Sequence, residues 1–188
     1  MALKDLFGRR RRPASAAREK LFALSTAQVT LDMDLGLKPA GVAAIVFKPM
    51  SAGEFTRVES DMQQLLDSAA AETGTRVEQR TDSFGYTWLI IRDPDLEDLV
   101  TTTHLVASEL EDAGFGPQLL CAVFRFEGGG KTVYWIYGFK NRAFWPFVPK
   151  EGQERDNAEE LELKAKLERE LPIEPDLTKW LALFDAPV

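Results

Sequence analysis

The chain has 188 residues, of which 45% are hydrophobic, so it is long enough to bury a core and we expect one folded domain. It contains no apolar run near the roughly 18 residues that cross a bilayer. Its single cysteine excludes an internal disulfide and a zinc site made of several thiolates. The net charge is −7, and an acidic protein lacks the broad basic face that phosphate binding needs, so no nucleic acid is expected as a partner.

Residues 1–15 are predicted to form a basic, flexible arm in front of a single α+β domain over residues 16–188. The net charge is +5 over residues 1–20 and −12 over the rest of the chain. The arm contains four consecutive arginines, Arg9, Arg10, Arg11 and Arg12. At an anionic bilayer these contribute about 4 kcal/mol at most. Two roles stay open: an arm that touches an anionic membrane surface or a partner, and a solvated tail that docks on the acidic residues 151–176.

The first third of the chain is predicted to contain two helices and two strands. A short helix is expected over residues 16–24. Apolar and polar residues alternate over 28–35, which is the period of a half-buried strand, and a second strand is expected over 41–47. Ser51 and Glu54 then have the spacing of a capping box, so a helix is expected from Ser51 to Ala69.

The middle of the chain is predicted to form two hairpins with a helix between them. The expected hairpins are residues 75–91, with a turn at 82–85, and residues 118–139, with a turn at the glycines 128–130. Asp93 is expected to cap the intervening helix, Pro94 to occupy its first position and Gly114 to end it. Up to this point the predicted elements repeat in the order strand, strand, helix.

The C-terminal region, residues 151–188, is predicted to be helical and packed on the domain. Asp156 is expected to cap a helix that Pro172 stops. Ion pairs one turn apart are expected there between Glu160 and Lys164 and between Glu162 and Lys166. A last short helix is expected over 177–184, anchored by Trp180, Leu181 and Phe184. The whole pattern predicts an α+β fold, with a largely antiparallel sheet and helices mostly on one face.

The sequence shows no set of residues that would make a catalytic, cofactor or metal site, so we do not expect an enzyme. His104 lies at the border of the apolar face of its helix, with no partner visible in the sequence. Cys121 lies mid-strand among apolar residues, where a thiol behaves as a small hydrophobe. Asp93, Asp95 and Asp98 have a spacing that suits a hard cation, but Pro94 and the following helix explain them as favourable charge at a helix N-terminus, so no metal site is expected.

Aromatic residues are unusually dense between Tyr134 and Phe147, where seven occur within 14 positions. Those that face inward belong to the core. Any that remain outside the sheet would form an apolar surface for a partner protein. Phe144, Trp145 and Phe147 are the candidates for such a partner surface.

Five segments spread over the chain carry a resemblance to a known family. They are LFAL (21–24), TDSFGYTW (81–88), DAGFGPQLLCAVF (112–124), WPFVP (145–149) and ERDNAEELELKAKLERELPIEPDLTKW (154–180). Together they resemble the PspA-associated protein family PspAB. The resemblance implies an actinobacterial protein of the phage-shock envelope-stress response, encoded near phage-shock protein A (PspA) and a small companion, PspAA. It implies no catalytic residues.

On this resemblance we expect a non-enzymatic adaptor of the PspA system that acts by protein contact, with PspA, PspAA or both as partners. We expect it in the cytoplasm, or peripheral to the inner face of the membrane through its arm. Besides the three aromatic residues, the candidate contacts are the polar cluster Arg155, Asp156 and Asn157. Two alternatives stay open: a secretion-chaperone-like module that binds extended peptides, and a small-molecule-binding protein or enzyme.

Overall fold

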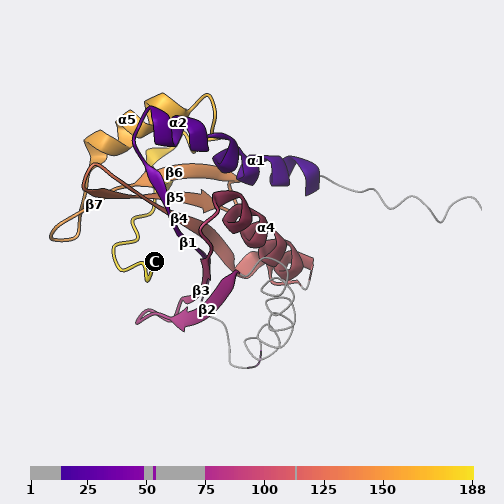
Figure 1. Cartoon of the computed structure of the whole chain (residues 1–188). Coiled ribbons are helices and arrows are strands. Elements are labelled where there is room, and N and C mark those ends of the chain that lie inside the picture. Colours follow the sequence, from indigo (N-terminus) through magenta and orange to yellow (C-terminus); the bar gives the residue numbers. More distant parts are fainter. Residues whose placement is uncertain (1–13, 49–52, 54–74, 113) are drawn as a thin grey trace, which may run out of the picture.

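A six-stranded antiparallel sheet forms the centre of the molecule, in the computed structural model of residues 14–48, 53, 75–112 and 114–188 (Figure 1). The strand order across the sheet is β2-β3-β1-β4-β5-β6. The strands are β1 (Lys38–Phe47), β2 (Arg76–Thr81), β3 (Thr87–Arg92), β4 (Leu119–Gly128), β5 (Lys131–Gly138) and β6 (Ala143–Phe147). A separate two-stranded ribbon of β7 (Pro149–Lys150) and β8 (Glu154–Arg155) follows. The predicted α+β fold with a largely antiparallel sheet is confirmed.

The helices cover one face of this sheet. They are α1 (Ala14–Thr26), α2 (Gln28–Met33), α4 (Leu96–Asp112) and α5 (Asn157–Leu167), with two short 3₁₀ turns, η1 (Gly116–Gln118) and η2 (Leu177–Lys179). α4 packs on β1 and β3, and α5 packs on β6 (Figure 1). Leucines of the four helices in the described ranges join one apolar core with the inward side chains of the strands. The expected helix over 51–69 and the arginines of the arm lie outside the described residues.

Residues 28–35 begin as the helix α2 and do not form the predicted strand. The alternating residues do not share one buried face, because Val29 is 70% and Met33 78% exposed while Leu31 is buried. The pattern that decides the structure starts earlier in the chain. Leu24, Ala27 and Leu31 are all buried at spacings of three and four, so the apolar stripe of α1 continues into α2.

Both predicted hairpins are present. β2 pairs with β3 from Arg76–Arg92 to Thr81–Thr87, and β4 pairs with β5 up to Gly128–Lys131. In the second hairpin the two turn residues, Gly129 and Gly130, have φ angles of +58° and +77°, a backbone conformation that glycine adopts at little cost.

Asp95 caps the N-terminus of α4. The prediction of Asp93 as the cap is therefore wrong. The Oδ1 atom of Asp95 accepts hydrogen bonds from the backbone N–H groups of Glu97 at 2.7 Å and Asp98 at 3.3 Å. Asp93 is buried two residues earlier, where it accepts hydrogen bonds from the Thr75 hydroxyl at 2.7 Å and from the backbone N–H of Asp95 at 2.9 Å. Asp93 therefore ties the start of β2 to the end of β3.

Replacing Asp95 with alanine is expected to lower the free energy of unfolding by about 1 kcal/mol, because two N–H groups at the start of α4 lose their acceptor. Urea denaturation followed by circular dichroism measures this change. Glu109 is exposed on the same helix, so Glu109→Ala serves as the control and should stay within about 0.5 kcal/mol of the parent. Equal effects of the two substitutions would contradict the capping role.

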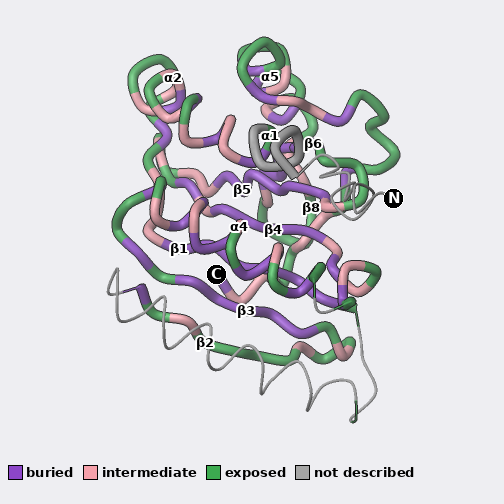
Figure 2. The backbone as a smooth tube through the Cα atoms, turned by 90° about the vertical axis from the view of Figure 1, so that its right-hand side faces the viewer, coloured by how far each residue is buried: buried purple, intermediate pink, exposed green. Residues whose placement is uncertain are grey.

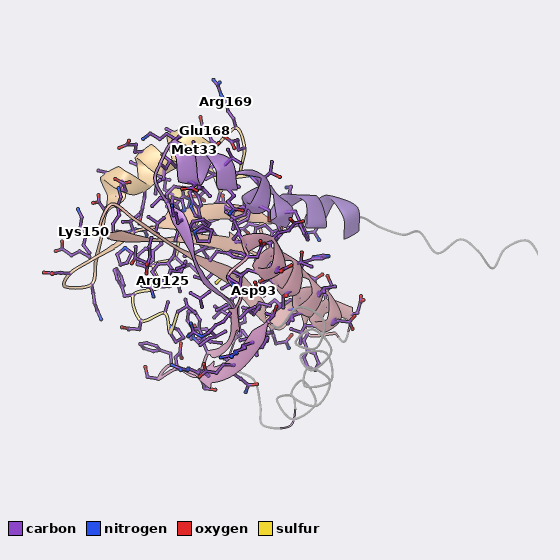
Figure 3. All side chains as sticks on the ribbon, viewed as in Figure 1. Met33, Asp93, Arg125, Lys150, Glu168 and Arg169 are labelled. Carbon is purple, nitrogen blue, oxygen red and sulfur yellow. The ribbon has the colours of Figure 1, made fainter. Side chains whose placement is uncertain are left out.

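The structure corrects part of the prediction for the C-terminal region. Asp156 caps α5 as predicted, by accepting from the Glu159 N–H at 3.1 Å, and Lys166 pairs with Glu162 at 2.6 Å. Glu160, however, pairs with Arg155 and leaves Lys164 to pair with Glu168. The helix predicted over 177–184 is wrong beyond Lys179, because the chain after the short turn η2 runs across the sheet. Figure 3 shows Glu168 and Arg169 projecting from the turn that follows α5.

Candidate functional site

The sheet face opposite the helices is covered by the C-terminal segment, which we define as residues 180–188. The end of the chain lies on the far side of the sheet from α4 (Figure 1). A second apolar core forms there between the segment and β1, β3, β4, β5 and β6. Figure 2 shows that the central strands are buried, whereas β2 at the sheet edge is exposed. The two ends of the segment, Trp180 and Val188, are buried in this core.

Three side chains of the domain hold the segment by its backbone carbonyl groups. Arg155 Nη1 donates to the Trp180 carbonyl at 2.8 Å, and Trp145 Nε1 donates to the Leu181 carbonyl at 3.1 Å. Tyr134 Oη donates to a main-chain oxygen of Val188 at 3.1 Å. These contacts recognise main-chain oxygen atoms, which every peptide carries. These three hydrogen bonds therefore do not depend on the side chains of the segment, whereas the packing of Trp180, Leu183 and Val188 on the sheet does.

An ion pair with a buried carboxylate fixes the first of these donors. Arg155 Nη2 lies 2.8 Å from Glu160 Oε2, and Glu160 is only 2% exposed. Glu160 also accepts from the backbone N–H of Val148 at 2.9 Å, and the guanidinium of Arg155 lies over the ring of Phe147 at 5.5 Å from its centroid. Arg155 thus joins β6, α5 and the carbonyl of Trp180.

An apolar groove of about 500 Å³ opens beside the C-terminal segment. Residues 181–186 of the segment line the groove, as do Asp82, Phe84 and Tyr86 of the turn, and we call these two sets its walls. Side chains of β1, β3 and β4, which we call its floor, and Gln153 complete the lining. Large apolar side chains remain exposed along both walls: Phe84, Tyr86, Leu181 and Phe184. Phe84, at 70% exposed, and Leu181, at 54%, lie on opposite walls.

Asp82 makes the turn wall of the groove rigid. One carboxylate oxygen of Asp82 accepts from the N–H groups of Phe84 and Tyr86, each at 2.9 Å, and the other accepts from Trp88 Nε1 at 2.9 Å. The exposed aromatic residues on this wall are therefore carried on a turn that is already ordered, which lowers the entropy cost of binding.

Cys121 lies in the floor of the groove and is buried. Burial raises the pKa of its thiol to about 12, so the thiol stays protonated near neutral pH and is a poor nucleophile. The prediction that Cys121 behaves as a small hydrophobe agrees with this position. In the described part of the chain, no three metal-ligating side chains are grouped closely enough to hold an ion.

The other residues singled out for chemistry lie away from the groove. His104 packs edge-on against Phe22, with 5.7 Å between the ring centroids, and its Nδ1 lies 3.5 Å from the hydroxyl of Ser108. Asp93 and Asp95 serve the backbone at the start of α4, as described above, which accounts for the aspartate spacing.

The predicted aromatic partner surface is wrong as an exposed surface, because Phe144, Trp145 and Phe147 are all buried. Phe144 belongs to the core on the helix side, whereas Trp145 and Phe147 belong to the core beneath the C-terminal segment. In the polar cluster, Arg155 and the capping residue Asp156 serve the fold, and the neighbouring Asn157 is exposed. Partner contacts by this cluster stay a prediction.

The sequence analysis missed the wall residues Phe84 and Tyr86. A signal for them was available: Phe84 lies in the tight turn of a hairpin, where polar residues and glycine are the rule and a large apolar side chain is exposed. Leu181 and Phe184 were singled out, but as anchors of a helix; in the structure Leu181 faces solvent, and Phe184 rests edge-on against Phe147 with ring centroids 5.1 Å apart.

Together the fold and the groove define an α+β domain with an apolar groove on the open face of an antiparallel sheet. The chain belongs to the PspAB family, PspA associated protein B, whose family model matches residues 1–188. The family is named for its association with PspA, so an accessory role in the PspA system follows. Searches of curated proteins and of solved structures found no significant match. None of the described helices is long and apolar enough to cross a membrane.

Proposed function

We propose that this protein is a non-enzymatic adaptor of the PspA stress response, which binds another protein of that system through the groove beside its C-terminal segment. PspA and PspAA are the partners we propose. The family membership supports the choice of system, and the groove supports binding as the activity. The cytoplasm is the compartment in which we place the adaptor.

The observation that carries the proposal is the gathering of exposed apolar side chains on both walls of one groove. Phe84, Tyr86, Leu181 and Phe184 come from segments about a hundred residues apart, yet they line the same hollow. Aromatic residues are enriched at protein interfaces, and those that fill a pocket contribute most of the binding energy. A small ligand inside the groove would leave the rim of these side chains in water, whereas a protein partner would cover it.

The polar groups at the groove also favour binding over catalysis. The two oxygen atoms of Asp82 accept three hydrogen bonds that shape the turn, and the thiol of Cys121 is protonated at neutral pH. A catalytic site needs an acid, a base or a nucleophile that is free to react. Contact of Arg9–Arg12 with an anionic membrane stays a prediction, because these residues lie outside the described chain.

A direct binding measurement tests the proposal. Purified PspA and PspAA are titrated separately onto the full chain and onto Phe84→Asp, which places a charge on the apolar rim. The substitution is expected to raise the Kd about tenfold or more, because a charged group cannot be desolvated cheaply at an apolar contact. Val29→Asp is the control: Val29 is also 70% exposed, but it lies on α2, and its Kd should stay within about twofold of the parent.

Two results would count against the proposal. If neither PspA nor PspAA binds the full chain, the groove does not serve this system. If both proteins bind but Phe84→Asp and Val29→Asp behave alike, the interface lies elsewhere on the molecule. Thermal unfolding of both variants, monitored beforehand, confirms that each is folded.

A further inference from the structure

We infer that the open face of the sheet is a binding site for an extended apolar peptide, that residues 181–188 occupy it as an internal ligand, and that an apolar segment of a partner protein takes their place. The involvement of a partner from the PspA system rests on the function proposed above. The occupancy of the face by the chain's own segment does not depend on it.

The first argument is how the segment is attached. Beyond Trp180, the described contacts of its backbone with the domain are two side-chain hydrogen bonds, from Trp145 to the Leu181 carbonyl and from Tyr134 to a main-chain oxygen of Val188. The segment is not a strand of the sheet, and none of residues 181–187 is fully buried. Segments with few buried apolar groups and few backbone hydrogen bonds open most easily in a folded protein.

The preceding residue marks where the firm attachment ends. Trp180 is buried, its Nε1 donates to the Glu174 carbonyl at 2.9 Å, and its own carbonyl accepts from Arg155. Lys179 closes the turn η2 by donating from its backbone N–H to the Asp176 carbonyl. The chain is therefore fixed up to Trp180, and residues 181–188 can leave without disturbing the anchor.

The second argument is the chemistry that the segment satisfies. Trp145 and Tyr134 present an indole N–H and a phenol O–H within an otherwise apolar surface. If the segment left and nothing replaced it, both donors would lose their acceptors, and Trp145 and Phe147 would lose their cover. An occupant must supply carbonyl oxygen atoms along an apolar strip. A polypeptide backbone with apolar side chains does both, whereas a lipid chain has no row of carbonyl groups.

The third argument is continuity with the groove. Residues 181–186 form one wall of the hollow whose other wall carries Phe84 and Tyr86. A partner segment that replaces this wall would contact Phe84 and Tyr86 of the remaining wall and cover the face of the sheet at the same time. A partner that contacts the groove alone reaches less apolar surface, so displacement increases the area available for binding.

Cys121 offers a reporter for displacement, because it lines the groove, is buried and is the only cysteine of the chain. Its rate of alkylation by iodoacetamide at pH 8 measures how often the face opens. Leu183 packs on the covered face, so the full-length variant Leu183→Asp is expected to speed alkylation about tenfold or more. Val29→Asp is the control, since Val29 is exposed on α2 and does not line the groove; its rate should stay within about twofold of the parent.

A synthetic peptide then tests occupancy in trans. The peptide carries residues 181–188, and at saturation it is expected to slow the alkylation of Leu183→Asp about tenfold, whereas a peptide of scrambled order is expected to protect less. Tyr134→Phe, which removes one donor with little change in shape, keeps the test valid if Leu183→Asp fails to fold; it should also speed alkylation. Equal rates in Leu183→Asp and Val29→Asp, or no protection by the peptide, would overturn the inference.

The outcome separates this inference from the proposed function. Protection by the peptide without binding of PspA or PspAA would retain the peptide site and reject the choice of partner. Binding of PspA that is sensitive to Phe84→Asp, without peptide protection, would retain the adaptor and reject the internal ligand. If PspA takes the place of the segment, saturating PspA should slow the alkylation of Cys121 in Leu183→Asp, as the peptide of residues 181–188 does. No slowing at saturating PspA would overturn the replacement of the segment by PspA.

Discussion

Glu160→Ala is expected to lower the free energy of unfolding by about 2–3 kcal/mol, which is one of the two largest effects we predict. The substitution removes the acceptor of the Arg155 guanidinium and of the Val148 N–H in a nearly closed environment. An uncompensated charge would then remain beside the ring of Phe147. Chemical denaturation, with the slope of the transition checked for change, measures the effect.

Glu162→Ala provides the matched control on the same helix. Glu162 also pairs with a cation, Lys166, but both side chains are exposed, so its loss should cost about 0.5 kcal/mol or less. The double variant Arg155→Met with Glu160→Leu removes both charges and should recover much of the stability lost in Glu160→Ala. Similar losses for Glu160→Ala and Glu162→Ala would show that the buried pair does not brace the region around the C-terminal segment.

Gly128→Ala is expected to lower the free energy of unfolding by about 2–3 kcal/mol, because the end of β4 passes directly over the turn before β1. A Cβ atom on Gly128 would lie 2.0 Å from the carbonyl oxygen of Gly36, and backbone must move to relieve the contact. Gly116→Ala is the control, since its Cβ would meet its nearest neighbour, in Glu111, at an ordinary 3.5 Å.

The contact between Gly128 and Gly36 lies next to the pairing of β1 with β4, in which Lys38 is opposite Glu127. The Gly128→Ala variant therefore tests whether this close contact supports the strand pairing. Thermal unfolding of both glycine variants, followed by circular dichroism, gives the comparison. A melting temperature of Gly128→Ala equal to that of Gly116→Ala would mean that the close approach is not needed for the strand pairing.

The local elements with strong sequence signals were predicted correctly. The turn at Gly129 and Gly130, the cap at Asp156 and the hairpin around Asp82 depend on residues close in sequence, and each was found at its expected place. Residues 28–35 were assigned wrongly because a short alternating run fits a strand as well as a single helical turn. Only the stripe that continues from Leu24 through Leu31 separates the two, and it crosses the boundary that we had drawn.

The candidate site was predicted less well, since it depends on contacts between residues far apart in the chain. The density of aromatic residues in β5 and β6 is visible in the sequence, but the cover over Trp145 comes from Leu181 and its neighbours, 36 positions further on. The apolar residues of the C-terminal segment fit a short helix as well as the irregular path that they take. Arg155 and Tyr134, which are distant in the sequence, hold the two ends of the segment. The sequence alone therefore could not show that Trp145 is buried and that Phe84 is exposed.

The most direct test of the account is quantitative capture of the tagged chain from its native host, with and without envelope stress, in three forms: the parent, Phe84→Asp and Val29→Asp. Mass spectrometry then quantifies PspA and PspAA in each sample. We predict that one or both are enriched with the parent and with Val29→Asp and are lost with Phe84→Asp. Equal recovery with all three forms, or a spread of unrelated unfolded proteins in place of PspA and PspAA, would contradict an adaptor that binds through this groove.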